Sequence, residues 1–130
     1  MSPIKMEKIE ANIRAVAKYV ELFNLNDPAG LPELFAEDCF VEDASSLPGE
    51  KSVHNRAELS RYFRDLFQRS KSCRLEITDL HGMGKKVLLL WKRTREWEDK
   101  PPEQCHGASL FNFSRAKILS VAEYVKTQSP

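Results

Sequence analysis

Three features are absent from the sequence, and each absence excludes a class of protein. Lysine plus arginine (20) nearly balance aspartate plus glutamate (19), so no excess charge indicates binding to nucleic acid or to a membrane surface. The first 23 residues lack an uninterrupted apolar run, so neither a signal peptide nor a membrane span is predicted, and we expect a cytoplasmic protein. The three cysteines form no CxxC pair, which favours reduced thiols over a disulfide framework.

Motifs for metal, phosphate or thiol chemistry are also absent. No spacing of histidine and cysteine matches a zinc site. The segment HGMGKK at residues 81–86 lies between predicted strands rather than before a helix, so it indicates a hairpin turn and not a phosphate loop. Cys105 and His106 are neighbours on a predicted strand and point to opposite faces, so they cannot act together as nucleophile and base. We therefore predict neither a metal nor another cofactor.

The chain does contain enough sequence to bury one core, and we predict a single domain over residues 1–130. Apolar residues at intervals of three and four predict a first helix that ends near residues 24–26. Residues 27–35 predict a short second helix, which begins with Asp-Pro. A capping-box pattern at residues 55–58 predicts a third helix, which ends near Ser70.

The spacing of apolar residues changes to two in the second half of the chain, which is typical of strands. Four long strands following one another predict an antiparallel meander. Helices on one side of such a curved sheet make an α+β domain. The predicted strands cover residues 39–43, 73–78, 86–97, 104–113 and 118–126.

The stretch EDCFVEDASS places a candidate catalytic carboxylate at Asp43. On a strand, Asp43 shares a face with Val41 and Cys39, so its side chain can point inward. Apolar neighbours would raise the pKa of this carboxyl and make it a better proton acceptor near neutral pH. The alternative is that Asp43 begins a solvated turn with Ser45 and Ser46.

The segment KYVELFNLNDPAGLPELFAEDCFVEDASS resembles the opening of ketosteroid isomerases, in the nuclear-transport-factor-2-like superfamily with its SnoaL-like branch. The resemblance implies a cystatin-like α+β barrel, in which a cone-like curved antiparallel sheet wraps three N-terminal helices around an internal cavity. It also implies a homodimer. In that family an aspartate in a VED segment moves the proton, and a tyrosine in the first helix polarises the substrate carbonyl. By resemblance these roles fall on Asp43 and Tyr19.

One position departs from the ketosteroid isomerase pattern. The family uses a second, protonated aspartate on a later strand, and the segment CHGASLFNF places Ser109 there. A serine hydroxyl can donate one hydrogen bond, but it stabilises an enolate less well than a carboxylic acid in an apolar site. The sequence therefore predicts Ser109 as a weaker donor and argues against the steroid reaction itself.

The predicted strand 86–97 has no wholly apolar face. Trp91, Arg93, Arg95 and Trp97 alternate with Leu90, Lys92, Thr94 and Glu96. If the arginines line the cavity, they can hold a ligand carboxylate or pair with Asp43. The other interpretation, which the sequence slightly favours, places both arginines on the outer face, at a dimer interface or in solvent.

Two functions remain open on the sequence. The first is a cofactor-independent isomerase, cyclase or dehydratase that acts on a small, partly apolar carbonyl compound by proton transfer through Asp43, with Tyr19 and Ser109 as donors. The second is a non-catalytic module of the same fold that binds a small ligand or dimerises. In both cases we expect a small-molecule ligand, and no nucleic acid or membrane. The residues predicted to line the ligand site are Phe23, Phe35, Tyr62, Phe63, Phe67, Trp91 and Phe111.

Overall fold

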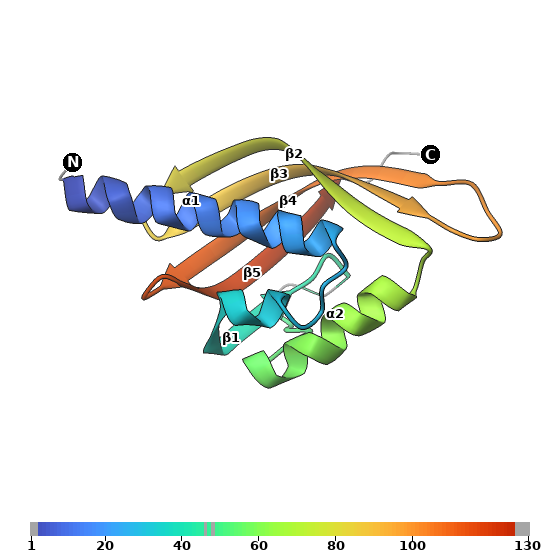
Figure 1. Cartoon of the computed structure of the whole chain (residues 1–130), viewed down its shortest axis with the longest axis horizontal. Helices are drawn as coiled ribbons and strands as arrows, with labels where there is room; N and C mark the ends of the chain where they lie inside the picture. Colours follow the sequence, from blue (N-terminus) through green and yellow to red (C-terminus); the bar gives the residue numbers. More distant parts are fainter. Residues whose placement is uncertain (1–2, 46, 48, 127–130) are drawn as a thin grey trace.

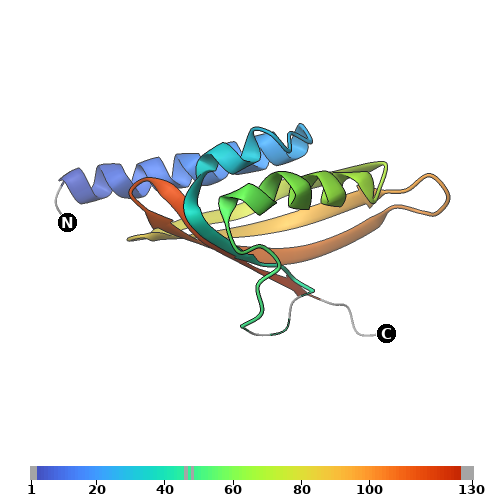
Figure 2. The same ribbon diagram turned by 90° about the horizontal axis from the view of Figure 1, so that it is seen from below.

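The computed structural model describes residues 3–45, 47 and 49–126, and these form a curved sheet with helices on one of its faces (Figures 1 and 2). Within these residues no helix is long and apolar enough to cross a membrane. The elements in chain order are helix α1 (Pro3–Asn24), 3-10 helix η1 (Leu31–Leu34), strand β1 (Phe35–Glu42), 3-10 helix η2 (Arg56–Glu58), helix α2 (Leu59–Gln68) and strands β2 (Ser72–Met83), β3 (Lys86–Glu96), β4 (Glu103–Ser114) and β5 (Lys117–Lys126).

The sheet is mixed rather than antiparallel throughout. Its strand order is β1-β5-β4-β3-β2, and the last four strands along the chain form the predicted antiparallel meander. β1, however, runs parallel to β5. No hairpin joins these two strands, because α2 and the other three strands separate them in sequence, and a long connection permits parallel pairing. The prediction of a wholly antiparallel sheet is therefore wrong at this edge.

The described residues form two α-helices, not the three helices that were predicted. The first ends at Asn24, as expected, but residues 27–35 contain only the four-residue 3-10 helix η1. The Asp27 side chain accepts hydrogen bonds from the backbone N–H groups of Ala29 (3.2 Å) and Gly30 (2.9 Å), which holds this segment as a turn. The chain then extends into β1 at Phe35, so no longer helix develops.

The start of α2 agrees with the predicted capping pattern. The side chain of Asn55 accepts a hydrogen bond from the backbone N–H of Glu58 at 3.2 Å. The Glu58 carboxylate accepts one from the backbone N–H of His54 at 3.1 Å, one residue earlier than in a regular capping box. One turn of 3-10 helix, η2, then leads into α2.

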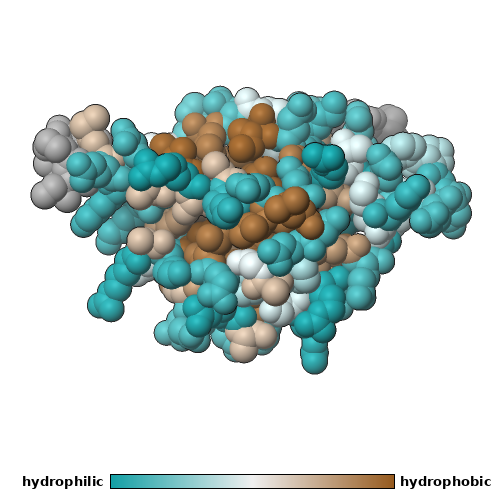
Figure 3. Space-filling model, in the orientation of Figure 1, coloured by the Kyte–Doolittle hydropathy of each residue, from teal (hydrophilic) through white to brown (hydrophobic). Residues whose placement is uncertain are grey.

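The core lies between α1 and the concave face of the sheet. Val16 and Val20 of α1 and Leu89 and Phe111 of the sheet are all buried there. On the face seen in Figure 3, apolar side chains gather near the middle, with hydrophilic ones around them. This packing of an amphipathic helix on an apolar sheet face supplies most of the stability expected of a domain of this size.

Asn24 fastens the end of α1 to the edge strand β2. Its side-chain amide donates to the Leu75 carbonyl at 2.9 Å, and its carbonyl oxygen accepts from the Leu75 N–H at 2.8 Å. These two bonds satisfy backbone groups at an otherwise open sheet edge. They also fix the place where the helix stops covering the sheet.

Candidate functional site

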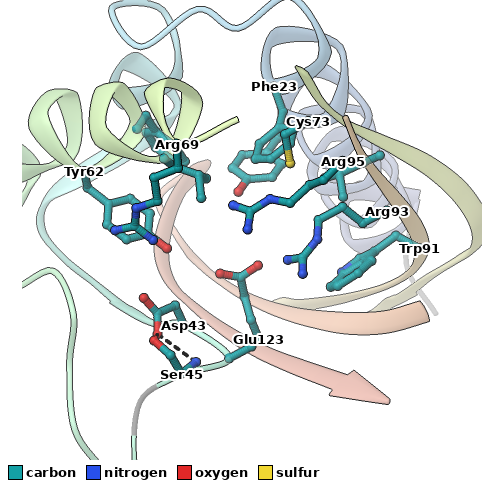
Figure 4. Close-up of a pocket in the computed structure, with 15 residues that line it drawn as sticks. Phe23, Asp43, Ser45, Tyr62, Arg69, Cys73, Trp91, Arg93, Arg95 and Glu123 are labelled. Atoms are coloured by element: carbon teal, nitrogen blue, oxygen red, sulfur yellow. Dashed lines mark hydrogen bonds between the residues drawn. The ribbon is translucent and has the colours of Figure 1, made fainter. Parts of the chain in front are cut away.

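A cavity of about 180 Å³ lies at the C-terminal end of α1, between that helix, α2, strands β2, β3 and β5, and the chain that follows β1 (Figure 4). Apolar groups on one part of its wall include Phe23, Phe63, Leu66 and Leu75. The ionisable and hydroxyl groups around it are Tyr19, Asp43, Tyr62, Arg69, Arg93, Arg95 and Glu123.

The cavity environment raises the proton affinity of the Glu123 carboxylate. It lies on β5 between Val121 and Val125, two residues that share its face of the strand. Burial is the largest cause that raises its pKa, and the nearby Asp43 carboxylate raises it further. Arg93 and Arg95 oppose these effects, and the result is a pKa of about 7. Glu123 can therefore both donate and accept a proton near neutral pH.

Asp43 combines the two alternatives that the sequence left open. Its Oδ1 accepts hydrogen bonds from the backbone N–H of Ser45 at 3.0 Å and from the Ser45 hydroxyl at 2.7 Å, so the turn exists. The same side chain also lines the cavity, on the side of Glu123 (Figure 4). The parallel register, in which Glu42 pairs with Ala122, brings the next residue of each segment together. Ser46, the other residue of the predicted turn, lies outside the described residues.

Tyr62 connects α2 to this pair of carboxylates. Burial, followed by the charges of Glu123 and Asp43, raises the pKa of the Tyr62 hydroxyl, and a hydrogen bond to Asp43 adds to the shift. The hydroxyl therefore keeps its proton at neutral pH and donates a hydrogen bond to the Asp43 carboxylate.

Tyr19 and Ser109, the two predicted donors, lie at different depths. Tyr19 lines the cavity from α1, and burial raises the pKa of its hydroxyl, so that it stays protonated. Its ring packs against Phe111 with centroids 5.1 Å apart. Ser109 is buried but is not among the cavity-lining residues, and its hydroxyl accepts a hydrogen bond from the Trp91 indole N–H at 3.0 Å.

The outer-face placement of Arg93 and Arg95, which the sequence slightly favoured, is wrong. Both side chains line the cavity, and so does Trp91 two residues earlier on the same face (Figure 4). Trp91 is buried and lies over Gly107, where an added Cβ would come within 2.4 Å of the indole ring. With Trp91 fixed inward, strand alternation points Arg93 and Arg95 inward too.

The aromatic residues predicted to contact a ligand divide into two groups. Phe23, Tyr62, Phe63 and Trp91 line the cavity. The other three lie behind its wall and pack within the aromatic cluster: these are Phe35, Phe67 and Phe111.

Two charged groups of the site, on β5 and after α2, were not predicted from the sequence. Glu123 carried the same signal as Asp43, a carboxylate on an otherwise apolar strand face, and it could have been found from its neighbours Val121 and Val125. Arg69 follows the last residue of α2 and is largely exposed at the cavity. No local pattern distinguished it from other surface arginines.

The described part of the chain contains no metal-binding cluster, and its three cysteines are free thiols. No cluster of three or more histidine, cysteine, aspartate or glutamate side chains is placed to hold a metal ion in residues 3–45, 47 and 49–126. Cys39 and Cys73 are buried free thiols, and Cys105 is a half-buried one. Cys73 forms part of the cavity wall.

Three solved structures share this fold. A candidate polyketide cyclase from Xanthomonas campestris pv. campestris is 18% identical, with a TM-score of 0.77 over 92% of this chain and 93% of that one. A Catenulispora acidiphila protein with a ketosteroid isomerase-like fold, solved with trimethylamine, is 20% identical, with a TM-score of 0.75 over 85% and 83%. An LEH-like epoxide hydrolase of M. tuberculosis is 14% identical, with a TM-score of 0.75 over 90% and 84%. At these identities the likeness shows the fold alone.

Sequence comparison places the chain in a family. No curated protein matches it significantly. The family model described as "SnoaL-like domain", however, matches residues 16–121, which include α1 from Val16 onward, Asp43 and the arginine strand β3, and end two residues before Glu123. This confirms the predicted relationship to the SnoaL-like and ketosteroid isomerase-like proteins, and the chain belongs to the SnoaL-like domain family.

Proposed function

We propose that the protein is a cofactor-independent enzyme that moves a proton within a small, partly apolar carbonyl compound, as an isomerase, cyclase or dehydratase. The observation that carries this proposal is the pair of carboxylates, Asp43 and Glu123, on one cavity wall, where the pKa of Glu123 is raised to about 7. With this pKa, both the acid and the ionised form of Glu123 are populated at neutral pH, so that a proton donor can lie beside a second carboxylate.

The ionised member of the pair, assigned here to Asp43, would take a proton from the carbon next to the carbonyl. The C–H bond breaks, an O–H bond forms on the carboxyl, and the electron pair moves to the carbonyl oxygen as an enolate. The Tyr19 hydroxyl, which keeps its proton, would donate a hydrogen bond to that oxygen. Glu123 in its acid form would then protonate a second atom of the substrate, either a carbon or a departing hydroxyl.

The Ser109 hydroxyl contributes indirectly in this scheme. The Ser109 hydroxyl accepts a hydrogen bond from the Trp91 indole N–H, and this bond positions the Trp91 ring, which forms part of the cavity wall. The second acid that the ketosteroid isomerase pattern places at Ser109 is replaced by Glu123, the residue directly paired with Ser109 across β4 and β5. The proposal therefore does not depend on a strong donor at position 109.

Solvent exchange tests the proposal without knowledge of the substrate. In D₂O, we expect the protein to accelerate loss of the α-proton NMR signals of at least one of 4-oxopentanoate, butanone and cyclohexanone. Glu123→Gln and Asp43→Asn should each slow the catalysed exchange by roughly 10²–10⁴-fold, the usual contribution of a general acid or base. Glu76→Gln, on the exposed outer face of β2, serves as the control. Exchange no faster than in buffer for all three ketones contradicts the enzymatic assignment.

A second candidate function is non-catalytic binding of a small ligand. It is favoured by the buried Arg95 Nε, which has no hydrogen-bond partner among the described residues and which a bound ligand could satisfy without any reaction. The trimethylamine complex of the Catenulispora acidiphila relative shows a small molecule bound to a protein of this fold. Saturable binding with no deuterium incorporation in the bound compound would favour this function over the first.

We also propose that two copies of the chain associate through the outer face of the sheet. Leu88, Leu90 and Leu110 lie only half-buried on that face, and Tyr124 beside them is 62% exposed. Covering such apolar groups favours association. Light scattering should give the mass of a dimer, and a monomer mass at micromolar concentration would contradict the proposal.

A further inference from the structure

The cavity holds more positive than negative groups. Three arginines line it, Arg69 at the end of α2 and Arg93 and Arg95 on β3, against the two carboxylates Asp43 and Glu123. Even with both carboxylates ionised, one positive charge is not balanced within the cavity wall. When Glu123 holds its proton, the imbalance grows to two. A negatively charged ligand would remove it.

Arg93 and Arg95 face Glu123 without forming an ion pair. Among the described residues, neither guanidinium has a carboxylate oxygen within 4.0 Å. The three side chains nevertheless point toward one another across the cavity (Figure 4). The space between them can therefore accept a group that hydrogen-bonds to the guanidinium ends.

Arg95 in particular has a donor that needs a partner. Its Nε is buried and makes no hydrogen bond in the described part of the chain. Buried polar groups in folded proteins are nearly always paired, and leaving one unpaired is costly. A carboxylate oxygen of a ligand could supply the missing acceptor at this position.

The two guanidinium groups are held in place by aromatic rings along the strand. The Arg93 Cζ lies 5.5 Å from the centre of the Trp91 ring, and the Arg95 Cζ lies 5.7 Å from that of Trp97. Trp91 is itself fixed by its hydrogen bond to Ser109. Restricting the arginines before binding lowers the entropy cost of holding a ligand.

We propose that Arg93 and Arg95 together bind the carboxylate of a small organic acid, with its carbon chain against Phe23, Phe63 and Leu66. Combined with the proposed function, on which this step rests, the substrate class is a small oxo acid rather than a neutral ketone. The cavity of about 180 Å³ limits such an acid to a small molecule. With its carboxylate on the arginines, its reactive carbon lies toward Asp43 and Glu123.

Binding of a charged and a neutral probe of the same shape tests this assignment, independently of turnover. Butanoate, butanamide and trimethylammonium are titrated into the full chain, and the indole N–H signals of its two tryptophans are followed by NMR. We expect butanoate to shift these signals saturably, and butanamide to require at least a tenfold higher concentration. Arg95→Gln and Arg93→Gln should each weaken butanoate binding at least tenfold.

Lys92→Gln is the matched control, because it removes one positive charge from the outer face of the same strand, and its butanoate affinity should equal that of the wild type. The two arginine variants are tested separately. If one of them does not fold, as judged by its amide spectrum, the other still tests the proposal. Equal affinity for butanoate and butanamide, unchanged affinity in a folded arginine variant, or tighter binding of trimethylammonium would each overturn the proposal.

The exchange and binding experiments can contradict the proposed function and the proposed carboxylate binding independently of each other. Arginine-dependent butanoate binding without any catalysed exchange leaves carboxylate recognition standing and removes the enzymatic function. Catalysed exchange of butanone that is unaffected by the arginine variants leaves the enzyme standing and removes the oxo-acid assignment.

Discussion

The concave face of the sheet has two halves that differ in chemistry although the same strands build both. Under α1, β3 presents Val87 and Leu89, which are fully buried. Beyond Trp91, the same face of the same strand presents Arg93 and Arg95 around a cavity. The change from apolar to charged residues on β3 marks the border between the core and the site.

The end of α1 explains where this border falls. Asn24, the last residue of the helix, is bonded to Leu75, and Leu75 pairs directly with Arg93 across the sheet. Before this point the helix covers the sheet and requires apolar partners. After it, α2 and the chain following β1 face the sheet, and a cavity lies between them and the strands. The packed core and the proposed site thus lie on successive stretches of one strand.

Shortening a side chain in the apolar half should have the largest effect on stability. Leu89→Ala leaves a cavity beneath α1, and we expect a loss of about 2–5 kcal/mol in the free energy of unfolding, measured by urea denaturation. The matched control is Leu25→Ala, because Leu25 is 67% exposed and its removal leaves no cavity. An equal loss in both variants would show that the region under α1 is not a close-packed core.

Removing the Glu123 charge from the cavity half should raise the free energy of unfolding, and this gain should depend on pH. The folded pKa of Glu123, about 7, lies above the unfolded value of 4.5. Between these values the folded state binds more protons than the unfolded state, so this group lowers stability as pH rises from 4.5 to 7. At pH 8, Glu123→Gln should therefore be more stable than the wild type by about 3 kcal/mol, and the difference should disappear below pH 4.

Thermal unfolding at pH 4 and pH 8 measures this difference. The exposed Glu76→Gln variant, on the outer face of β2, should follow the wild type at both pH values. A stability gain in Glu123→Gln that is the same at both pH values would show that the effect comes from packing and not from the ionised carboxylate.

Removing the hydrogen bonds at the border between the halves should cause the smallest of the three changes in the free energy of unfolding. Asn24→Ala removes both hydrogen bonds to Leu75, and we expect a loss of about 2 kcal/mol because the freed backbone groups lie at a sheet edge that water can reach. Hydrogen exchange should become faster at the Leu75 amide in particular. Gln68→Ala, at the exposed end of α2, is the control. Unchanged exchange at Leu75 would show that the two hydrogen bonds from Asn24 do not stabilise the edge strand β2.

The regular elements could be predicted from the sequence because their signals are local. The predicted strands at 86–97, 104–113 and 118–126 agree with β3, β4 and β5 to within one residue at each end, and the first helix ends where it was predicted to end. Apolar periodicity reports which residues must face a core, whatever packs against them. The same local logic failed at residues 27–35, where the bonds of Asp27 to Ala29 and Gly30 compete with helix formation.

The site could be predicted only in part. Asp43, Tyr19 and Tyr62 were identified beforehand and do line the cavity, while their catalytic roles stay proposals. Which face of β3 looks inward could not be decided from the strand itself, because both faces carry charged residues. The Trp91 ring over Gly107 decided it, through a contact between two different strands.

By itself, the sequence determined the α+β class, the meander, the first helix and the family resemblance, since each depends on neighbours along the chain. The tertiary structure alone decided the parallel pairing of β1 with β5, which places Asp43 beside Glu123, and the convergence of both carboxylates with the arginines of β3. The raised pKa of Glu123 follows from its burial and from the nearby Asp43 carboxylate, which outweigh the opposing charges of Arg93 and Arg95, because burial and charge act through space and not along the chain.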